Sequence, residues 1–286
     1  MDCSIIIPHY NQANYLKACL SALAADDTDL RYEVIIIDVL HPASHEMKQA
    51  IVGDHIRWIS THVKNPYASR NIGIRNAQSD NIILLDAKCS PQKGFINSAV
   101  QALRYHKIVA GPYVITPRSD KGKDLIYGIF YLHTERNIIK GYGVTCGNLG
   151  CQKTLFEKTG PFDESHLSGR DIAWTKKVLS EGYEIKYVPG MVVNYPGQTW
   201  TELLMSIKKY MRGVVFYQKE QGWSPKMMLL HGLKMLFPMR QSTYQDALAR
   251  REISLSGQGK WYLWLWVWRA KATMAYHYLK SMLKDG

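Results

Sequence analysis

The sequence predicts an α/β fold with a mostly parallel sheet that is sandwiched by helices. Short apolar runs of strand length alternate with helix-like segments over about the first 195 residues. This alternation is typical of parallel sheets whose strands are buried on both faces. The chain of 286 residues is long enough for a sizeable core, and its hydrophobic content of 46% and charged content of 21% are ordinary for a globular protein.

The first half of the chain gives the clearest elements. Buried strands are expected at the apolar runs 3–8, 32–38, 56–61 and 81–86, with a fifth strand at 107–117. Helices are expected at residues 12–25, 44–52, 66–78 and 91–106. In the first of these helices Leu16, Leu20 and Leu23 recur at the spacing of one helix face.

The second half is less regular. Residues 118–143 are polar and contain glycines, and they give no clear pattern. Residues 144–165 predict a strand, a short helix and a turn, and residues 169–196 predict a helix followed by strands. The alternation stops near residue 198, so we expect one domain at 1–197 and a helical extension at 198–286.

Polar residues stand where three of the predicted strands end. They are Pro8-His9-Tyr10, Asp38 and Asp86. In open parallel sheets ligands bind beyond the carboxyl ends of the strands, and this topology would gather these residues along one edge. Taken one at a time, the two acids are more simply loop-capping residues at strand ends.

The cysteines and the N-terminus indicate the compartment. Five cysteines occur at irregular spacings with no CxxC pair, which predicts free thiols and argues against a zinc site. The first residues enter a strand at once and lack the basic and apolar regions of a signal peptide. We therefore expect a cytoplasmic protein.

Six segments occur in an order and spacing that a known family shares. They are SIIIPHYNQANYLKACLSAL, YEVIIID, ASRNIGIRNAQSDNIILLDAKCSP, CGNLGCQKTLFEKTGPFDE, GRDIAWTKKVLSEGYEIKYVP and VVNY. Over roughly residues 3–195 the chain resembles the family-2 inverting glycosyltransferases, which have the GT-A nucleotide-sugar fold. The resemblance implies that fold and descent from enzymes that use sugar nucleotides, whereas activity has to be argued from the site.

The resemblance implies a nucleotide site at the strand ends. Pro8 and Tyr10 would line the base pocket, and Asp38 would accept a hydrogen bond from the base. Arg70 would lie near the base and the phosphates. Asp86 matches the first acid of the family's DxD motif and would face the ribose or a metal.

The resemblance also implies a second pocket for the donor sugar and the acceptor. Gly147 and Asn148 would line this pocket, with Arg170 beside it. Asp171 matches the family's general base, which takes the proton of the acceptor hydroxyl as that hydroxyl attacks the anomeric carbon. Such help is typically worth about 100- to 10,000-fold in rate. Without this context, Asp171 would be an ordinary acid in the first turn of a helix.

The sequence departs from the family pattern in four places. Lys88 stands where the DxD motif has its second acid, Val39 follows Asp38 in place of an acid, and Arg170 replaces the usual glutamate. The late histidine that often completes the metal site is absent, because the segment VVNYP has asparagine and tyrosine there. Two expected metal contacts, the second acid of the DxD motif and the late histidine, are thus missing. Two cations, Lys88 and Arg170, stand where the family has acids.

These changes suggest a donor site that works without a metal. A hard divalent cation needs oxygen ligands and is repelled by an ammonium group. Lys88 would place its own charge against the diphosphate, with Arg170 or Arg70 assisting. No cofactor is therefore certain, and Mg²⁺ or Mn²⁺ would bind through Asp86 if it binds at all. An ordinary solvated lysine remains an alternative for Lys88.

The expected reaction is transfer of a sugar from a nucleotide-sugar donor, with UDP the family's commonest nucleotide. The acceptor would be a hydroxyl of a glycan or a lipid-linked glycan, in the synthesis of a cell-surface polysaccharide or glycoconjugate. A second hypothesis is a catalytically inactive GT-A-fold protein that acts as partner or scaffold of an active transferase. A homo-oligomer stays open.

The extension at 198–286 is basic and rich in tryptophan. From residue 201 onward it holds 14 lysines and arginines against 5 aspartates and glutamates, and six of the eight tryptophans lie from residue 200 onward. Residues 261–283 contain no glycine or proline and are expected to form one helix. Aromatic and basic residues together favour a membrane surface, whereas the apolar run at 261–268 is far shorter than the ~20 residues that span a bilayer.

Two hypotheses follow for this extension, and nucleic-acid binding is considered beside them. It could hold the protein peripherally on the inner face of the membrane, near lipid-linked acceptors. It could instead pack on the catalytic domain or on a second subunit. Nucleic acid is not an expected partner, because no RNA- or DNA-binding motif accompanies the basic and aromatic residues.

Overall fold

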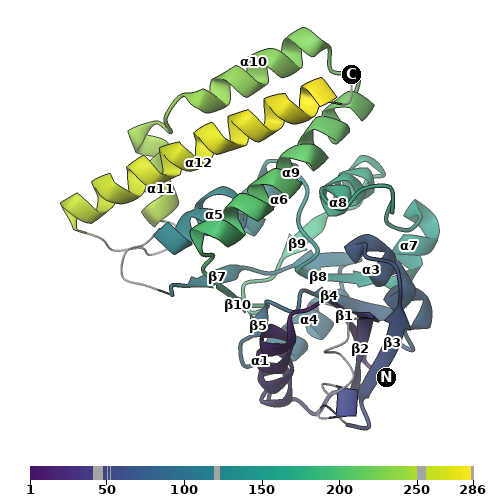
Figure 1. The fold of residues 1–286 in the computed structure, drawn as a ribbon. Coiled ribbons are helices and arrows are strands. Elements are labelled where there is room, and N and C mark those ends of the chain that lie inside the picture. The colour runs from purple at the N-terminus through teal and green to yellow at the C-terminus, as the bar shows by residue number, and fades with distance from the viewer. Residues whose placement is uncertain (41–47, 50, 52, 119–122, 250–255, 285–286) are drawn as a thin grey trace. The chain divides into compact units, whose positions relative to one another are not determined.

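The computed structural model describes residues 1–40, 48–49, 51, 53–118, 123–249 and 256–284. It divides into two compact units (Figure 1). Unit 1 comprises Met1–Val114 and His133–Tyr195, and unit 2 comprises Ile115–Leu132 and Pro196–Gly286.

The units differ from the predicted division at residue 197 in one segment. Residues 115–132 were expected in the first domain, but they group with the C-terminal segment. The physical reason is hydrophobic burial, since Ile126 and Ile129 lie in the same apolar core as Leu203 and Val267.

Unit 1 contains a seven-stranded sheet. Its strands are β1 (Cys3–His9), β2 (Tyr32–Val39), β3 (Ile56–Thr61), β4 (Asn81–Leu85), β6 (Ile108–Ala110), β8 (Asn148–Gln152) and β9 (Ile185–Tyr187). The order is β3-β2-β1-β4-β8-β6-β9. β8 runs antiparallel to its neighbours β4 and β6, and every other neighbouring pair is parallel. The predicted fold class is confirmed.

Helices flank this sheet. They are α1 (Ala13–Ala24), α3 (Pro66–Asn76), α4 (Phe95–Leu103), α6 (Thr134–Ile139), α7 (Lys153–Thr159) and α8 (Arg170–Ser180). Alternate strand residues point to opposite faces of a sheet. Ile6 and Ile35 share one core with Ile74 of α3 and Trp174 of α8. All five cysteines are buried thiols without a disulfide, as expected.

The helix expected at 91–106 begins later than predicted. Ser90–Pro91 instead forms a short strand, β5, and α4 begins after Gly94, whose φ is 83°. Asp26 caps the start of α4, because its carboxylate accepts the backbone N–H groups of Gly94 at 2.5 Å and Ile96 at 2.8 Å. The cap comes from 68 residues earlier in the chain, so the local pattern could not locate it.

The strand expected at 107–117 is broken in two. β6 lies in the large sheet, whereas β7 (Tyr113–Thr116) belongs to a three-stranded sheet of order β5-β10-β7, with β10 at Val193–Pro196. Gly111 lies at the break, and a Cβ there would be only 1.9 Å from the carbonyl oxygen of Met191. The helix expected at 44–52 lies largely outside the described residues.

Unit 2 is helical. It contains a short 3₁₀ helix at Lys123–Leu125, α5 (Ile126–Phe130), α9 (Trp200–Glu220), α10 (Pro225–Leu236), α11 (Gln241–Ala249) and α12 (Gly257–Lys284). The single helix expected at 261–283 is confirmed as part of α12. None of the helices in the described ranges combines the length and the hydropathy that crossing a bilayer requires.

A buried carboxylate, Glu33, joins β1, β2 and β3 near their amino-terminal ends. This end of the sheet is opposite to the carboxyl ends of the strands, where the candidate site residues were predicted. Glu33 of β2 is 2% exposed and accepts hydrogen bonds from the Ser4 hydroxyl at 2.7 Å and the Gln78 backbone N–H at 2.7 Å. Its other oxygen accepts from Arg57 Nη1 of β3 at 2.6 Å. Burial alone would raise the pKa of Glu33, but these three donors together lower it below its usual value.

The first prediction concerns stability against pH. A depressed carboxyl pKa stabilises the folded state above the unfolded-state pKa of about 4.3, and this stabilisation is lost as pH falls through the folded-state pKa. Glu33→Gln should therefore lower the free energy of unfolding by about 1–3 kcal/mol at pH 7 and by less below about pH 4. Urea unfolding at pH 7, 5 and 3.5 measures this. Glu157→Gln, an exposed acid on α7, is the control. An equal cost of Glu33→Gln at every pH would contradict the prediction.

Candidate functional site

The sheet brings the three polar strand ends together. β1 lies between β2 and β4, and His9 is paired in register with Asp38. Asp86 follows the last residue of β4, and its backbone N–H donates to the carbonyl of Gly147 before β8 at 3.3 Å. These residues therefore lie along one edge, at the carboxyl ends of parallel strands.

Asp38 is fully buried and bound by two cationic or polar groups. His9 Nδ1 lies 2.9 Å from one carboxylate oxygen, and Lys48 Nζ lies 2.9 Å from the other. The backbone N–H of Gln12 donates to His9 Nε2 at 3.2 Å. Because Nε2 accepts, Nδ1 carries the proton and donates to Asp38. Asp38 thus positions His9 and Lys48, and its direct contact with a base stays a prediction.

The loop after β1 presents an aromatic ring to solvent. Tyr10 is 44% exposed, and Pro8 before it is partly buried. Asn11 follows with a φ of 49°, a left-handed conformation that asparagine tolerates better than most residues. Lys64 Nζ lies 5.1 Å from the centre of the Tyr10 ring. The exposed ring offers a surface on which a planar base could stack.

The next contact is an ion pair between α3 and the end of β4. Arg70 Nη2 donates to Asp86 Oδ1, and Arg70 is 5% exposed whereas the Asp86 side chain is 43% exposed. Burial alone would lower the pKa of the Arg70 guanidinium, but the nearby charges, Asp86 foremost, hold it above its usual range. Arg70 therefore remains cationic at the edge of the sheet.

Asp171 lies at the start of α8, where three donors orient it. One carboxylate oxygen accepts the Tyr67 hydroxyl at 3.1 Å and the backbone N–H of Ile172 at 3.0 Å. The other accepts the backbone N–H of Cys146 at 3.3 Å. The preceding Gly169, with a φ of 83°, lets the chain turn into the helix. A carboxylate at a helix N-terminus is further favoured by the helix dipole.

Tyr67 connects Asp171 to the ion pair between Arg70 and Asp86. Its hydroxyl donates to Asp171, and the guanidinium of Arg70 lies 5.7 Å from the centre of its ring. Burial and the charge of Asp171 raise the pKa of the Tyr67 phenol well above its usual value, so the phenol remains a donor. Asp171, Tyr67, Arg70 and Asp86 therefore form one connected cluster, which we call the acid–arginine cluster.

Tyr67 is the member of the acid–arginine cluster that the sequence analysis did not predict. It precedes Arg70 by three residues on α3, so both side chains project from the same face of that helix. The helix is fixed at its start by Asn65, whose side chain accepts the N–H groups of Tyr67 and Ala68. The signal in the sequence was the spacing of Tyr67 and Arg70, read together with the asparagine cap.

Gly147 and Asn148 occupy different environments. A Cβ on Gly147 would lie 2.9 Å from Asp86 Oδ2, so glycine keeps this approach to the carboxylate open. Asn148 is fully buried, and its amide N–H groups donate to the carbonyls of Pro112 at 3.1 Å and Met191 at 2.9 Å. Gly147 thus adjoins the acid–arginine cluster, whereas the amide of Asn148 holds backbone together.

Arg170 and Lys88, which stand where the family pattern has acids, contact Asp163 and the ring of Tyr15. Arg170 is 3% exposed and its guanidinium lies 2.9 Å from Asp163 Oδ2. Burial opposes ionisation of Asp163, but hydrogen bonds from Ser165 and Arg170 lower the pKa of that carboxyl. Lys88 Nζ lies 5.2 Å from the centre of the Tyr15 ring, and in the described part of the chain Lys88 makes no salt bridge.

The described residues at this edge do not form a metal site by themselves. One oxygen of Asp86 is engaged by Arg70, and Lys88 stands two residues further on. Within the ranges that the structure describes, no three histidine, cysteine, aspartate or glutamate side chains are arranged to hold a metal ion. Asp86 Oδ2 is the Asp86 oxygen that Arg70 does not engage. Because Mg²⁺ at phosphate sites uses one or two carboxylates together with substrate phosphates, Asp86 could hold a cation only jointly with a bound diphosphate.

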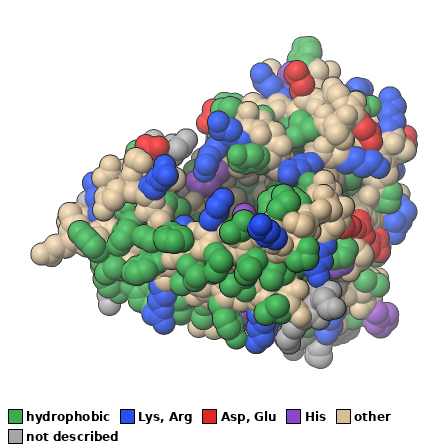
Figure 2. All heavy atoms as spheres, turned by 90° about the horizontal axis from the view of Figure 1, so that it is seen from above, with side chains coloured by type: hydrophobic (Ala, Val, Ile, Leu, Met, Phe, Trp, Pro, Cys, Tyr) green, Lys and Arg blue, Asp and Glu red, His purple; other side chains and the backbone are tan. Residues whose placement is uncertain are grey.

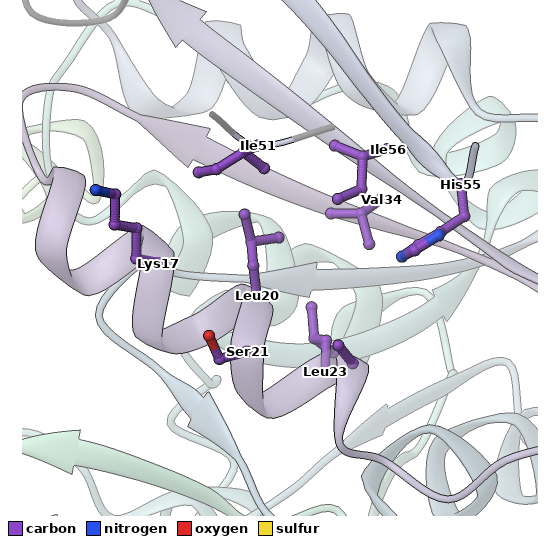
Figure 3. A pocket seen from close by; sticks show the side chains of 9 residues that line it. Lys17, Leu20, Ser21, Leu23, Val34, Ile51, His55 and Ile56 are labelled. Atoms are coloured by element: carbon purple, nitrogen blue, oxygen red, sulfur yellow. The ribbon is translucent and has the colours of Figure 1, made fainter. Parts of the chain in front are cut away.

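A hollow in unit 1 lies elsewhere (Figure 3). It is lined by Lys17, Leu20, Ser21, Leu23, Ala24, Val34, Ile51, His55 and Ile56. Val34 and Ile56 are paired in register near the amino-terminal ends of β2 and β3. The hollow is therefore at the opposite end of the strands from the acid–arginine cluster, and its lining is mainly apolar.

The family follows from a comparison with known sequences. A family described as "Glycosyl transferase family 2" matches residues 4–158, more than half of the chain. The chain belongs to glycosyl transferase family 2. The resemblance expected from the sequence is thereby confirmed, and this protein is a glycosyltransferase. The matched range includes Arg70, Asp86 and Gly147 and ends before Asp171.

Two curated relatives of this glycosyltransferase match most of its length. Glycosyltransferase AglE of Haloferax volcanii is 25% identical over 209 residues, which cover 70% of this chain and 69% of that protein. A second relative, from Methanococcus voltae, is 21% identical over 242 residues, which cover 77% of this chain and 72% of that protein. It is named dolichyl N-acetyl-alpha-D-glucosaminyl phosphate 3-beta-D-2,3-diacetamido-2,3-dideoxy-beta-D-glucuronosyltransferase.

Two solved structures share the fold of this glycosyltransferase. The mannosyltransferase PcManGT from Pyrobaculum calidifontis, in complex with GDP-Man and Mn²⁺, has a TM-score of 0.63 at 15% identity, covering 99% of this chain and 86% of that one. TarS 1–349 of S. aureus in complex with UDP-GlcNAc has a TM-score of 0.58 at 14% identity, covering 100% and 91%. At these identities the likeness shows the GT-A fold and nothing more.

The second prediction tests Tyr67 as a positioning residue. Tyr67→Phe removes one of three donors to Asp171 and leaves the ring below Arg70. We expect about tenfold slower release of nucleoside diphosphate, the cost of one hydrogen bond to a charged group, with an unchanged donor KM. The assay uses a panel of UDP- and GDP-sugars with glycan acceptors. Tyr105→Phe, at a ring that is 81% exposed, is the control. A wild-type rate for Tyr67→Phe would contradict the role.

Proposed function

We propose that this glycosyltransferase transfers a sugar, with inversion, from a nucleotide-sugar to an acceptor hydroxyl. The observation that supports this most is the acid–arginine cluster. It places an oriented carboxylate, Asp171, in one connected network with a buried cation, Arg70, and the strand-end acid Asp86. Proton acceptance and stabilisation of a leaving diphosphate require groups of these two charges.

In the proposed reaction Asp171 takes the proton of the acceptor hydroxyl. The hydroxyl oxygen forms a bond to the anomeric carbon as the bond from that carbon to the diphosphate oxygen breaks. The backbone N–H groups and the Tyr67 hydroxyl keep the Asp171 carboxylate in a fixed orientation, which supports its use as the base. Negative charge grows on the departing nucleotide, and Arg70, held at this edge by Asp86, is the cation that we propose stabilises it.

We propose that the base of the nucleotide binds beside Tyr10 and Pro8. The exposed ring of Tyr10 supports this placement, because stacking on an aromatic face needs only a planar base. UDP is the first choice, and the neighbour TarS was solved with UDP-GlcNAc. The neighbour PcManGT was solved with GDP-Man, so titration has to decide between the nucleotides.

We propose that the diphosphate is held by side-chain cations. Lys88 rests on the ring of Tyr15, and a cation–π contact of this kind is worth only about 0.5–1 kcal/mol when exposed. A diphosphate would therefore compete well for its ammonium group. Arg70 and Arg170 are both paired with an acid, but Arg70 is paired with Asp86, two residues before Lys88, so Arg70 is the better candidate for the assisting arginine. The position of Lys88 two residues after Asp86 supports a site that needs no metal.

For the acceptor we propose a glycan or a lipid-linked glycan. The name of the Methanococcus voltae relative describes transfer to a dolichyl-linked sugar phosphate, which supports a lipid-linked acceptor. Such an acceptor lies at a membrane. A cytoplasmic protein bound peripherally to the inner face through residues 198–286 would reach it, in the synthesis of a cell-surface polysaccharide or glycoconjugate.

One observation favours a second candidate function. Asp86 is paired with Arg70, and Lys88 stands where the DxD motif has its second acid, so this motif offers a metal one carboxylate in place of two. A non-catalytic partner or scaffold of an active transferase would have to keep the fold, but it would not have to turn over a nucleotide-sugar donor. The intact hydrogen bonding of Asp171 supports the catalytic alternative.

The third prediction separates these alternatives by calorimetric titration with UDP, GDP and CMP, in EDTA and again with Mn²⁺. We expect one nucleotide to bind in EDTA and Lys88→Ala to weaken it by about tenfold or more, because a charge-assisted contact to phosphate is lost. Lys93→Ala, at a lysine that is 73% exposed, is the matched control. Binding only with Mn²⁺ would show that a metal is recruited after all. No binding in either condition would favour the scaffold.

The fourth prediction tests the base. Asp171→Asn should lower turnover by at least about 100-fold, the lower limit for general-base help, and leave the affinity for the nucleotide unchanged. Asp80→Asn, at an exposed acid after α3, should leave both quantities unchanged. Retained nucleotide binding shows that the variant is folded. Turnover of Asp171→Asn within about threefold of the wild type would assign the proton transfer to another group.

A further inference from the structure

Two helices of unit 2 expose a row of apolar side chains that the catalytic chemistry does not use. On α10 the row is Leu229, Leu233 and Leu236, and on α12 it is Trp261, Leu265 and Trp268. All six are between 40% and 58% exposed. We call these six residues the α10–α12 face.

The exposure follows from the helical pattern. Each row advances by three or four residues, so its members share one side of their helix. On other sides, α10 buries Met228 and Gly232, and α12 buries Leu263, Val267 and Ala270. Both helices thus already have a packed side in the core of unit 2, and the exposed rows are additional apolar surface.

The two rows adjoin one another. Trp268 Nε1 donates to the carbonyl of Leu236 at 2.8 Å. A Cβ on Gly232 would lie 2.6 Å from Leu279, which shows how closely the helices approach. Figure 2 shows hydrophobic side chains gathered over these helices, with lysine and arginine side chains among them and at their margins. Contiguous exposed apolar surface of this kind marks an interaction site.

The charge of the two helices restricts what can cover the face. α10 and α12 together contain seven lysines and arginines and no aspartate or glutamate. Lys226, Lys234 and Lys280 are among those exposed to solvent. A second copy of the same face would bring like charges together. A surface with negative head groups above an apolar interior matches both the charge and the apolar row.

We propose that the α10–α12 face seats this glycosyltransferase on the surface of an anionic phospholipid bilayer. The leucines and tryptophans enter the boundary between head groups and acyl chains, and the lysines contact the lipid phosphates. Tryptophan is favoured at this depth because its ring is apolar with one polar edge. The membrane location in the proposed function rests on the composition of residues 198–286, whereas the structure assigns it to a defined face.

The experiment is vesicle flotation of the full chain. Vesicles of phosphatidylcholine alone are compared with vesicles that contain about 30% phosphatidylglycerol, whose head group makes the surface negative. We expect binding to the anionic vesicles, and much weaker binding to the neutral vesicles or in high salt, because each basic residue near the surface contributes about fivefold in affinity.

Two paired variants test the face itself. Leu233→Gln with Leu265→Gln should lower vesicle binding by at least about tenfold, since two leucines can no longer be buried in lipid. Lys226→Glu with Lys234→Glu should also lower it by about tenfold or more. The matched control is Tyr105→Gln with Ile139→Gln, at apolar residues of unit 1 that are 81% and 74% exposed, and it should bind as the wild type does.

Three outcomes would overturn the proposal. They are no binding to anionic vesicles, equal loss in the control pair, and a dimer in solution that the leucine pair dissociates, which would assign the face to a second copy. The nucleotide titration is read separately. Vesicle binding without nucleotide binding would support the membrane-binding face and contradict the proposed sugar transfer. Nucleotide binding without vesicle binding would contradict only the membrane-binding face.

Discussion

The site depends on one constraint, which is that a buried guanidinium needs a counter-charge. Arg70 is 5% exposed on α3, and leaving such a charge unpaired in the interior would cost several kcal/mol. Asp86, at the end of β4, supplies the partner and thereby fixes α3 to the edge of the sheet. Once that helix is fixed, Tyr67 one turn earlier is placed to reach Asp171 of α8. The base and the cation of the proposed reaction are therefore positioned by the same pair.

The same principle of charge balance recurs elsewhere in unit 1. Asp38 is neutralised by Lys48 and hydrogen-bonded by His9, and Asp163 is neutralised by Arg170. Each acid thus has a cation from another segment of the chain. Carboxylates that are already balanced attract a divalent ion less strongly than open ones do, which fits a donor site whose cations are side chains. Unit 2 presents the opposite case, because its basic residues in α10 and α12 have no acids within those helices to balance them.

The sequence by itself determined the fold class and the edge of the sheet where the candidate site lies. Alternating apolar runs and helix-like segments are local patterns, so β1 to β4, α1, α3 and α12 were predicted close to their observed bounds. Asp38, Asp86 and His9 were predicted to share an edge because parallel topology gathers strand ends, and the register of β1 with β2 confirms this for the first and last of them. The family resemblance added candidate roles, which remain predictions for the individual residues.

Only the tertiary structure decided which side chains meet. Asp26 caps α4 from the loop after α1, residues 115–132 join the core of unit 2, and Tyr67 bridges to Asp171 more than 100 residues later. The contacts of Arg170 and Lys88 were likewise decided by the tertiary structure, which places Asp163 beside Arg170 and the ring of Tyr15 beside Lys88. The physical reason is that hydrophobic periodicity and spacing report on local geometry, whereas these pairings are made between segments that are distant in sequence and are selected by burial and charge.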